Sequence, residues 1–285
     1  MTYNQLRLKS IKLLQNANIE SAEHVVDQLI LFSFNVTKVE LLSKLHIELD
    51  LLFKPKFDTC LRRVLNLEPL DLVLGSSFFY KHEYFISKGV LVPRPETELL
   101  VDSLQDVLRN DFSENFNGLE CGFGSGIISI ELALAFPKSN WVSYDISPIA
   151  YECAKQNSNN LGCNNVSWKL QDFFLDHSFE FNNDYPICLV SNPPYIPTAD
   201  LSLLDKSVQL YDPKLALDGG DDGLDFYRRL FEVSCKHKSI KLVCFECGIH
   251  QANTIKIIGE TNGFRIIKCI QDYQRIDRVL IFEKM

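Results

Sequence analysis

The sequence predicts an α/β protein in which a small all-helical domain precedes a larger domain built on a doubly wound, mostly parallel sheet. From about residue 117 to the C-terminus, short apolar runs typical of buried strands alternate with helical patterns. Before Gly75 the chain contains no glycine, and its apolar residues recur at helical spacing. A chain of 285 residues is long enough for one large and one small domain.

The same patterns divide the chain into three segments. Residues 1–75 are expected to form the helical domain, and residues 96–285 the sheet domain, which opens on a helix. Residues 76–95 connect the two. This connector alternates loosely between apolar and polar residues and contains Lys88-Gly89, which indicates a β-hairpin.

Seven strands are expected in the sheet. They lie near residues 118–121, 141–144, 166–170, 186–190, 264–270 and 279–282, with one more buried strand around Cys244. Only a short turn separates the last two, so one of them is predicted to run antiparallel. The carboxyl ends of the parallel strands meet at one edge, where open α/β sheets bind ligands.

A glycine-rich loop follows the first of these strands and precedes a helical pattern. Its glycines allow a tight turn and a close approach of the backbone to a ligand, although a tight strand-to-helix turn alone would also explain them. The loop lacks the third glycine of the dinucleotide fingerprint and the Lys-Ser/Thr ending of a P-loop. The candidate cofactor-binding residues here are Glu120, Gly122, Phe123, Gly124, Ser125 and Gly126.

Acidic residues follow the next two strands. Asp145 ends the second strand, where a carboxylate can accept hydrogen bonds from both ribose hydroxyls of a nucleoside; it could also cap the helix that begins near Ser147. Asp172 and Phe173 follow the third strand and could flank an adenine ring. A phenylalanine packed in the core is the alternative for Phe173.

The tetrapeptide Asn192-Pro193-Pro194-Tyr195 follows the fourth strand. Two prolines cannot continue a central strand, so the chain leaves the sheet at this edge. The Asn192 side chain and the Pro193 carbonyl offer two acceptors for the two hydrogens of an –NH2 group, and Tyr195 offers a flat face for stacking. These residues are predicted to hold a planar, amine-bearing group.

The order of these motifs resembles that of the class I S-adenosylmethionine-dependent methyltransferases, whose NPPY group methylates planar nitrogens. Upstream, residues 89–98 contain Pro93-Arg94-Pro95-Glu96-Thr97-Glu98 and look like the signature segment of the HemK/PrmC family. Members of that family are protein-(glutamine-N5) methyltransferases that modify peptide chain release factors. Further matches at residues 68–70, 77–80, 211–213, 217–224, 246–251 and 277–279 extend the resemblance over nearly the whole chain.

The resemblance implies a class I (Rossmann-like) methyltransferase domain with a seven-stranded sheet. In the chain, this domain is preceded by a helical domain that recognises the substrate. The implied reaction moves a methyl group from S-adenosyl-L-methionine to the N5 nitrogen of the glutamine in the Gly-Gly-Gln motif of class 1 release factors, leaving S-adenosyl-L-homocysteine. Asn192, Pro193 and Tyr195 would be catalytic, and Asn192 would also contact the cofactor. The implied substrate-binding residues are Asn192, Pro193, Pro194, Tyr195, Arg94 and Glu96.

Some positions depart from the family pattern or have a second explanation. Family members more often carry Asp where Glu120 stands, and a smaller residue where Phe123 stands. Arg94 could line the substrate entrance, or it could pair with Glu96 or Glu98 and hold the connector. Three other functions stay open: glutamine methylation of a ribosomal protein, adenine N6-methylation of a nucleic acid, and non-catalytic binding.

Composition bears on whether the protein binds nucleic acid or a membrane and on where in the cell it is expected. The net charge of −8 and the pI near 5.3 argue against a protein that grips nucleic acid through many phosphates. The nine cysteines are scattered, no signal peptide is apparent, and no apolar run reaches the ~20 residues of a membrane span. A cytoplasmic monomer without membrane contact is expected. Cys244, Cys247 and His250 lack a partner pair at zinc spacing, so no metal is predicted.

Overall fold

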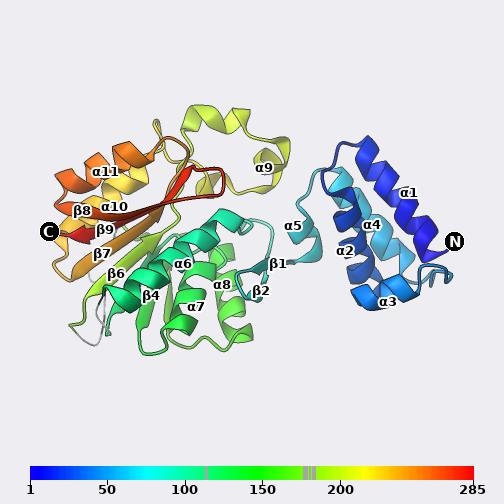
Figure 1. Ribbon diagram of the computed structural model, residues 1–285, viewed down its shortest axis with the longest axis horizontal. Helices are drawn as coiled ribbons and strands as arrows, with labels where there is room; N and C mark the ends of the chain where they lie inside the picture. The colour runs from blue at the N-terminus through cyan, green and yellow to red at the C-terminus, as the bar shows by residue number, and fades with distance from the viewer. Residues whose placement is uncertain (113–114, 176–178, 180, 182–183) are drawn as a thin grey trace. The chain divides into compact units, whose positions relative to one another are not determined.

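The computed structural model describes residues 1–112, 115–175, 179, 181 and 184–285, and the chain divides into two compact units (Figure 1). The first comprises Met1–Ser76 and Lys206–Tyr211; the second comprises Ser77–Asp205 and Asp212–Met285. Within the described ranges, no helix is long and apolar enough to cross a bilayer.

The first unit is helical and contains α1 (Tyr3–Asn16), α2 (Ala22–Phe34), α3 (Lys38–Ser43), α4 (Lys54–Leu65), α5 (Leu70–Leu74) and α9 (Lys206–Tyr211). Capping boxes at Thr2 and Thr37 start α1 and α3. The apolar faces meet in one core, in which Val26, Leu29 and Phe57 have no exposed surface.

Helix α9 belongs to this unit although it lies some 130 residues later in the chain. The Ser207 hydroxyl donates to the Leu67 carbonyl at 2.8 Å, and the Tyr211 hydroxyl donates to the Asn66 carbonyl at 2.9 Å. The sequence pattern had left this segment within the sheet domain, because only these distant backbone partners reveal where it packs.

The second unit contains a seven-stranded sheet, which confirms the predicted fold class. The strand order is β5-β4-β3-β6-β7-β9-β8. The strands are β3 (Asn117–Cys121), β4 (Asn140–Asp145), β5 (Val166–Leu170), β6 (Ile187–Ser191), β7 (Ile240–Glu246), β8 (Phe264–Gln271) and β9 (Asp277–Lys284). The first five pair in parallel, whereas β9 inserts antiparallel between β7 and β8. The antiparallel strand expected near the C-terminus is therefore β9.

Helices cover both faces of this sheet (Figure 1). α6 (Pro95–Asn110), α7 (Ile127–Ala135) and α8 (Pro148–Asn160) lie on one face, and α10 (Asp225–Lys236) and α11 (Ala252–Thr261) lie on the other. Two short 3-10 helices, Thr198–Leu203 and Lys214–Ala216, follow β6. Because both faces are covered, every residue of β3 and β6 is buried.

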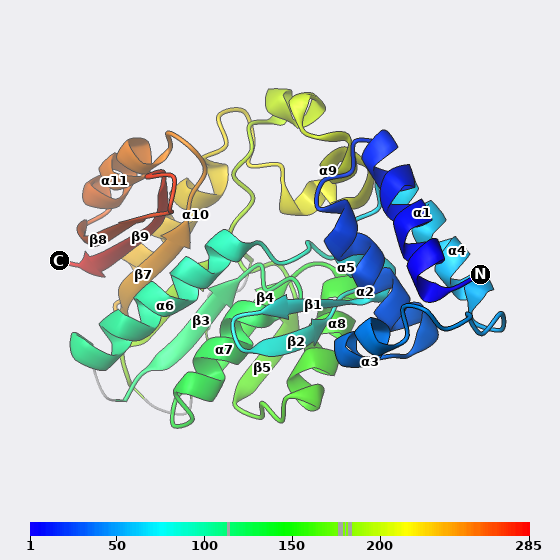
Figure 2. The same cartoon turned by 45° about the vertical axis from the view of Figure 1, so that its right-hand side comes forward.

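The connector contains the two-stranded sheet of β1 (Ser76–Phe79) and β2 (His82–Phe85), beside α8 in Figure 2. The turn falls at Tyr80, whose φ is 55°, and not at Lys88-Gly89, which lies beyond β2. The hairpin was thus predicted from the wrong turn. Asn157 of α8 holds β2, since its side chain accepts from the Phe85 N–H at 2.7 Å and donates to the Phe85 carbonyl at 3.0 Å.

Candidate functional site

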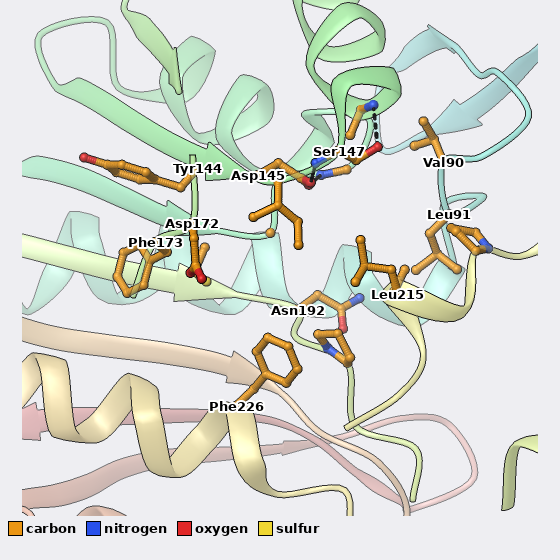
Figure 3. Close-up of a pocket in the computed structure, with 18 of the residues that line it drawn as sticks. Val90, Leu91, Tyr144, Asp145, Ser147, Asp172, Phe173, Asn192, Leu215 and Phe226 are labelled. Atoms are coloured by element: carbon orange, nitrogen blue, oxygen red, sulfur yellow. Dashed lines mark hydrogen bonds between the residues drawn. The ribbon is translucent and has the colours of Figure 1, made fainter. Parts of the chain in front are cut away.

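A pocket opens at the carboxyl ends of β3, β4, β5 and β6 (Figure 3). The sequence-predicted residues that line it are Gly122, Gly124, Asp145, Asp172, Phe173, Asn192 and Pro194. In Figure 3, Tyr144, Asp172 and Phe173 stand on one side and Val90, Leu91 and Leu215 on the other. The four motifs therefore meet in one pocket because parallel strands end at a common edge.

The glycine-rich loop is shaped by hydrogen bonds from its own backbone. Gly122 has φ 76° and Gly124 has φ 54°, a region in which residues with side chains are strained. The Gly122 N–H donates to the Tyr144 carbonyl at 2.8 Å, and the Gly124 N–H donates to Asp145 Oδ2 at 2.9 Å. A Cβ at Gly122 would meet no atom within 4 Å, so the backbone borders open space.

Asp145 joins the loop to the next helix. Its Oδ1 accepts from the Ser147 N–H at 2.8 Å, while Ser147 itself caps α8 by accepting from the Ala150 N–H. Burial raises the pKa of Asp145, and the backbone N–H groups of Ser147 and Gly124 oppose that rise. Each carboxylate oxygen can accept more than one hydrogen bond, so these contacts are compatible with ribose hydroxyls as further donors.

Glu120 does not reach the pocket. It is fully buried in β3, where Oε2 accepts from the Ser129 hydroxyl, and Oε1 has no hydrogen-bond partner among the residues described. Burial raises the pKa of Glu120 to about 8. In this structure the carboxylate that sequence analysis placed beside the cofactor faces Ser129 of α7.

The remaining loop residues pack against neighbouring elements and not against the pocket. The Phe123 ring is buried edge-on against Trp168, with ring centroids 4.9 Å apart. The buried Ser125 uses its carbonyl to accept from the Asn157 side chain at 2.9 Å. Gly126 starts α7 with φ 84°, and a Cβ there would lie 2.9 Å from the Cβ of Ala154. These three residues do not line the pocket.

Asp172 and Phe173 stand at the end of β5. Asp172 lines the pocket, and its Oδ1 accepts from the Phe174 N–H at 2.9 Å. Phe173 touches the pocket only at its edge, because it is 3% exposed and packs edge-on against Tyr144 at 5.5 Å. Phe173 thus contributes mainly to the core, which was the alternative for this ring.

The NPPY tetrapeptide lies only partly in the pocket. Asn192 and Pro194 line it, whereas Pro193 is buried and Tyr195 lies outside the lining. The Asn192 side chain donates through Nδ2 to Thr97 Oγ1 at 3.2 Å. The Tyr195 carbonyl accepts from Gln251 Nε2 at 2.8 Å, which holds the tetrapeptide from the side of α11.

Glycines of the segment before α10 pack directly against this tetrapeptide. A Cβ at Gly219 would lie 2.8 Å from the Pro194 carbonyl oxygen, and one at Gly223 would lie 2.3 Å from the Tyr195 carbonyl oxygen. Such distances leave no room for a side chain. The glycines of this segment therefore set the path of the NPPY backbone.

Arg94 and Glu96 do not line the pocket. Arg94 pairs with the buried carboxylate of Asp212, 118 residues away, and with neither acidic neighbour in its own segment. Glu98 instead accepts from the Tyr80 N–H at 2.8 Å. Burial raises the pKa of Asp212, and the charge and hydrogen bond of Arg94 oppose this rise.

Several lining residues were missed by the sequence analysis. Apolar side chains of Val90, Leu91, Ile146, Leu215 and Phe226 complete the walls, and Arg229 contributes a guanidinium that lies 3.7 Å from the ring centroid of Phe174. No local pattern distinguishes these residues from core residues. Among the described residues, no group of three or more His, Cys, Asp or Glu could hold a metal ion.

Comparison with known proteins identifies the family. A model of the PrmC N-terminal domain matches residues 5–75, and a model of the methyltransferase small domain matches residues 95–206. Over 284 residues the chain is 31% identical to the release factor glutamine methyltransferase of Bacillus anthracis, a match that covers 99% of this chain and 98% of the relative. The chain belongs to the release factor glutamine methyltransferase family.

Other relatives agree with this assignment. The release factor glutamine methyltransferase of Thermodesulfovibrio yellowstonii is 32% identical over 225 residues, which is 79% of each chain. Among solved structures, the hMettl16 catalytic domain in complex with MAT2A 3′UTR hairpin 6 has a TM-score of 0.53 at 15% identity and covers 81% of each chain. At that identity the second similarity concerns the methyltransferase fold alone.

Proposed function

We propose that this protein transfers a methyl group from S-adenosyl-L-methionine to the side-chain amide nitrogen of the glutamine in the Gly-Gly-Gln motif of class 1 peptide chain release factors. The observation that carries the proposal is the position of Asn192, which lines the same pocket as the glycine-rich loop and Asp145. A side chain suited to bind the substrate amide thus lies next to residues suited to bind the nucleoside part of the cofactor. The two relatives described above are release factor glutamine methyltransferases, which supports this choice of substrate.

The pocket residues fit the proposed cofactor. The backbone of Gly122 is open to a ligand, Gly124 lines the same pocket, and Asp145 offers a carboxylate for ribose hydroxyls. Asp172 offers an acceptor for an exocyclic amine, and the apolar wall that includes Ile146 suits a purine ring. When bound, S-adenosyl-L-methionine supplies a methyl group on a positively charged sulfonium, which is both electrophile and leaving group.

The task of this chain's residues is to hold a poor nucleophile. An amide nitrogen shares its lone pair with its carbonyl, so its orientation must be imposed. Asn192 Oδ1 and the Pro193 carbonyl would accept its two hydrogens, which fixes the nitrogen and stabilises the positive charge that grows on it. Tyr195 would bound the amide plane. No base is needed before transfer, because the proton becomes acidic only afterwards.

The proposal also assigns roles to the helical domain and to the segment that contains Arg94 and Glu96. Residues 1–75 would receive the release factor, and Arg94 and Glu96 would lie at the entrance for the substrate. We further propose that the protein acts as a monomer in the cytoplasm. Family membership, and the position of residues 93–98 just after the pocket-lining residues Val90 and Leu91, support the roles proposed for the helical domain, Arg94 and Glu96.

The test uses purified protein, labelled S-adenosyl-L-methionine and a release factor whose Gly-Gly-Gln glutamine is either intact or replaced by alanine. Label in the intact factor alone is expected. The Asn192→Ala variant should lose at least about a hundredfold in rate, because an acceptor for the developing charge is removed. Label in ribosomal protein or duplex DNA, with none in the release factor, would overturn the substrate assignment.

A further inference from the structure

Three side chains form a hydrogen-bonded chain that runs from the pocket into the sheet. Asn192 Nδ2 donates to Thr97 Oγ1 at 3.2 Å, and Thr97 Oγ1 donates to Glu246 Oε2 at 2.7 Å. Thr97 and Glu246 are each 2% exposed. The three residues come from the loop after β6, the first turn of α6 and the end of β7, so only the folded unit brings them together.

The hydroxyl in the middle has one hydrogen, and this decides the orientation of the amide. Because Thr97 gives its hydrogen to the Glu246 carboxylate, it can act toward Asn192 only as an acceptor. Only the –NH2 end of the Asn192 amide can satisfy that acceptor. The other end, Oδ1, is left for the pocket that Asn192 lines.

We propose that Thr97 and Glu246 are positioning residues that hold the Asn192 amide with Oδ1, rather than Nδ2, directed toward the substrate nitrogen. The inference rests on the proposed function, because the glutamine amide to be methylated carries two donors and needs acceptors. An Asn192 amide turned by 180° would place –NH2 against –NH2. Such an arrangement would repel the substrate in the geometry required for transfer.

A purely structural role does not account for the carboxylate. Glu246 ends a strand whose preceding residues from Leu242 to Phe245 are buried and apolar, and an ionised group is costly in such surroundings. The Tyr227 hydroxyl donates to the backbone carbonyl of Glu246 and does not engage its carboxylate. The Glu246 carboxylate accepts from the Thr97 hydroxyl, and the Asn192 side chain also acts on it as a hydrogen-bond donor, so both of these partners lead to the pocket.

The charge of Glu246 also makes the orientation depend on pH. Burial raises the pKa of Glu246 to about 7, and the charge of Glu96 adds to the rise; the hydrogen bond from Thr97, the charge of Arg278 and the hydrogen bond from Asn192 oppose it. The titratable groups that act on Glu246 or are acted on by it are Glu96, Tyr195, Tyr227, Cys244, Cys247 and Arg278. Burial raises the pKa of these two tyrosines and two cysteines away from neutrality.

Protonation of Glu246 removes the constraint on the amide. Above a pH of about 7 the carboxylate is ionised and must accept from Thr97. Below it, the carboxyl group can donate its own hydrogen to Thr97, whose hydroxyl is then free to donate to the Asn192 carbonyl. The turnover number, kcat, of the wild-type protein is therefore expected to fall as the pH drops below about 7.

The kinetic test compares Thr97→Val, which removes the hydroxyl at nearly constant shape, with Thr97→Ser, which keeps it. For Thr97→Val we expect kcat to fall by about tenfold to a hundredfold, with the Kd for S-adenosyl-L-methionine within about twofold of wild type. Thr97→Ser should retain most of the wild-type kcat. Glu246→Gln should have a low kcat that no longer changes between pH 6 and pH 8.

Tyr227→Phe is the matched control, because it removes a buried hydroxyl that bonds to Glu246 through the backbone carbonyl and not through the carboxylate. It is expected to lower the melting temperature and to leave kcat unchanged. Equal losses of kcat in Thr97→Val and Tyr227→Phe would overturn the proposal, since loosened packing would then explain both. Full activity of Thr97→Val would overturn it as well.

A second measurement needs no substrate and separates this inference from the proposed function. The side-chain amide signals of Asn192 in a ¹H–¹⁵N spectrum, assigned with Asn192→Asp, are followed from pH 6 to pH 8. We expect them to titrate in wild type, to respond less in Thr97→Val and to be unresponsive in Glu246→Gln. Signals that do not titrate in wild type would refute the relay, whatever the protein methylates.

Discussion

The Glu120→Gln variant should reveal how much a buried carboxyl group destabilises the sheet. Glu120 has no exposed surface, and Ser129 is its hydrogen-bond partner. The pKa of Glu120 is raised from 4.5 to about 8, chiefly by burial, with the charge of Asp145 adding to the rise and the hydrogen bonds of Ser129 opposing it. Glutamine keeps the length of the side chain and is neutral at every pH.

The size and sign of the effect follow from proton linkage. Between its unfolded pKa of 4.5 and its folded pKa of about 8, Glu120 holds a proton that the unfolded chain releases. The stability that this carboxyl contributes is full below pH 4.5 and is lost as the pH rises through 8. At pH 7, which is 2.5 units above 4.5, the loss is about 3 kcal/mol.

Urea denaturation at a series of pH values from 4.5 to 8 measures this effect. The free energy of unfolding of Glu120→Gln, relative to wild type, should rise by about 3 kcal/mol between pH 4.5 and pH 7. The buried amide adds a cost of about 1–3 kcal/mol that does not vary with pH, so the change with pH is diagnostic. Glu152→Gln, at an exposed position on α8, should show no such rise.

A constant difference between Glu120→Gln and wild type across this pH range would refute the reasoning. It would mean that Glu120 ionises as easily in the folded protein as in the unfolded chain. The Glu120 carboxylate would then not be buried as the structure shows it. Such a result would favour the expectation that Glu120 contacts the cofactor.

Three further variants probe the pocket. Gly219→Ala should lose about 1–3 kcal/mol of stability and most of its methyl transfer, because its Cβ would lie 2.8 Å from the Pro194 carbonyl oxygen; denaturation and rate assays check this. Asp145→Asn should weaken S-adenosyl-L-methionine binding by about 1–3 kcal/mol in calorimetry, since the Gly124 N–H or a ribose hydroxyl loses an acceptor. Phe226→Ala should raise the Kd for S-adenosyl-L-methionine about tenfold, and an unchanged Kd would exclude this ring from the binding wall.

Local patterns were sufficient for the sheet. The strand from Val166 to Leu170 has the bounds that the sequence predicted, and a helix from Ile127 to Ala135 follows the glycine-rich loop as expected. A buried parallel strand such as β6 is a nearly continuous apolar run with proline close to both of its ends, so both signals lie within a few residues of each other. The position of the hairpin was predicted less accurately, because its turn at Tyr80 contains no glycine that would mark it in the sequence.

The sequence by itself also determined which groups would meet, since residues that follow successive parallel strands must share one edge of the sheet. It could not determine which of them face the pocket. Glu120 turns away to Ser129, and Arg94 finds Asp212 far along the chain.

Only the tertiary structure decided the contacts that depend on distant segments. The Thr97–Glu246 hydrogen bond joins residues 149 positions apart, and Leu215 and Phe226 reach the pocket from segments beyond the NPPY tetrapeptide. The physical reason is that sequence patterns carry information only over short distances along the chain. Periodicity and turn chemistry report on neighbours within one element, whereas burial and hydrogen-bond partners are set by whichever element packs against it.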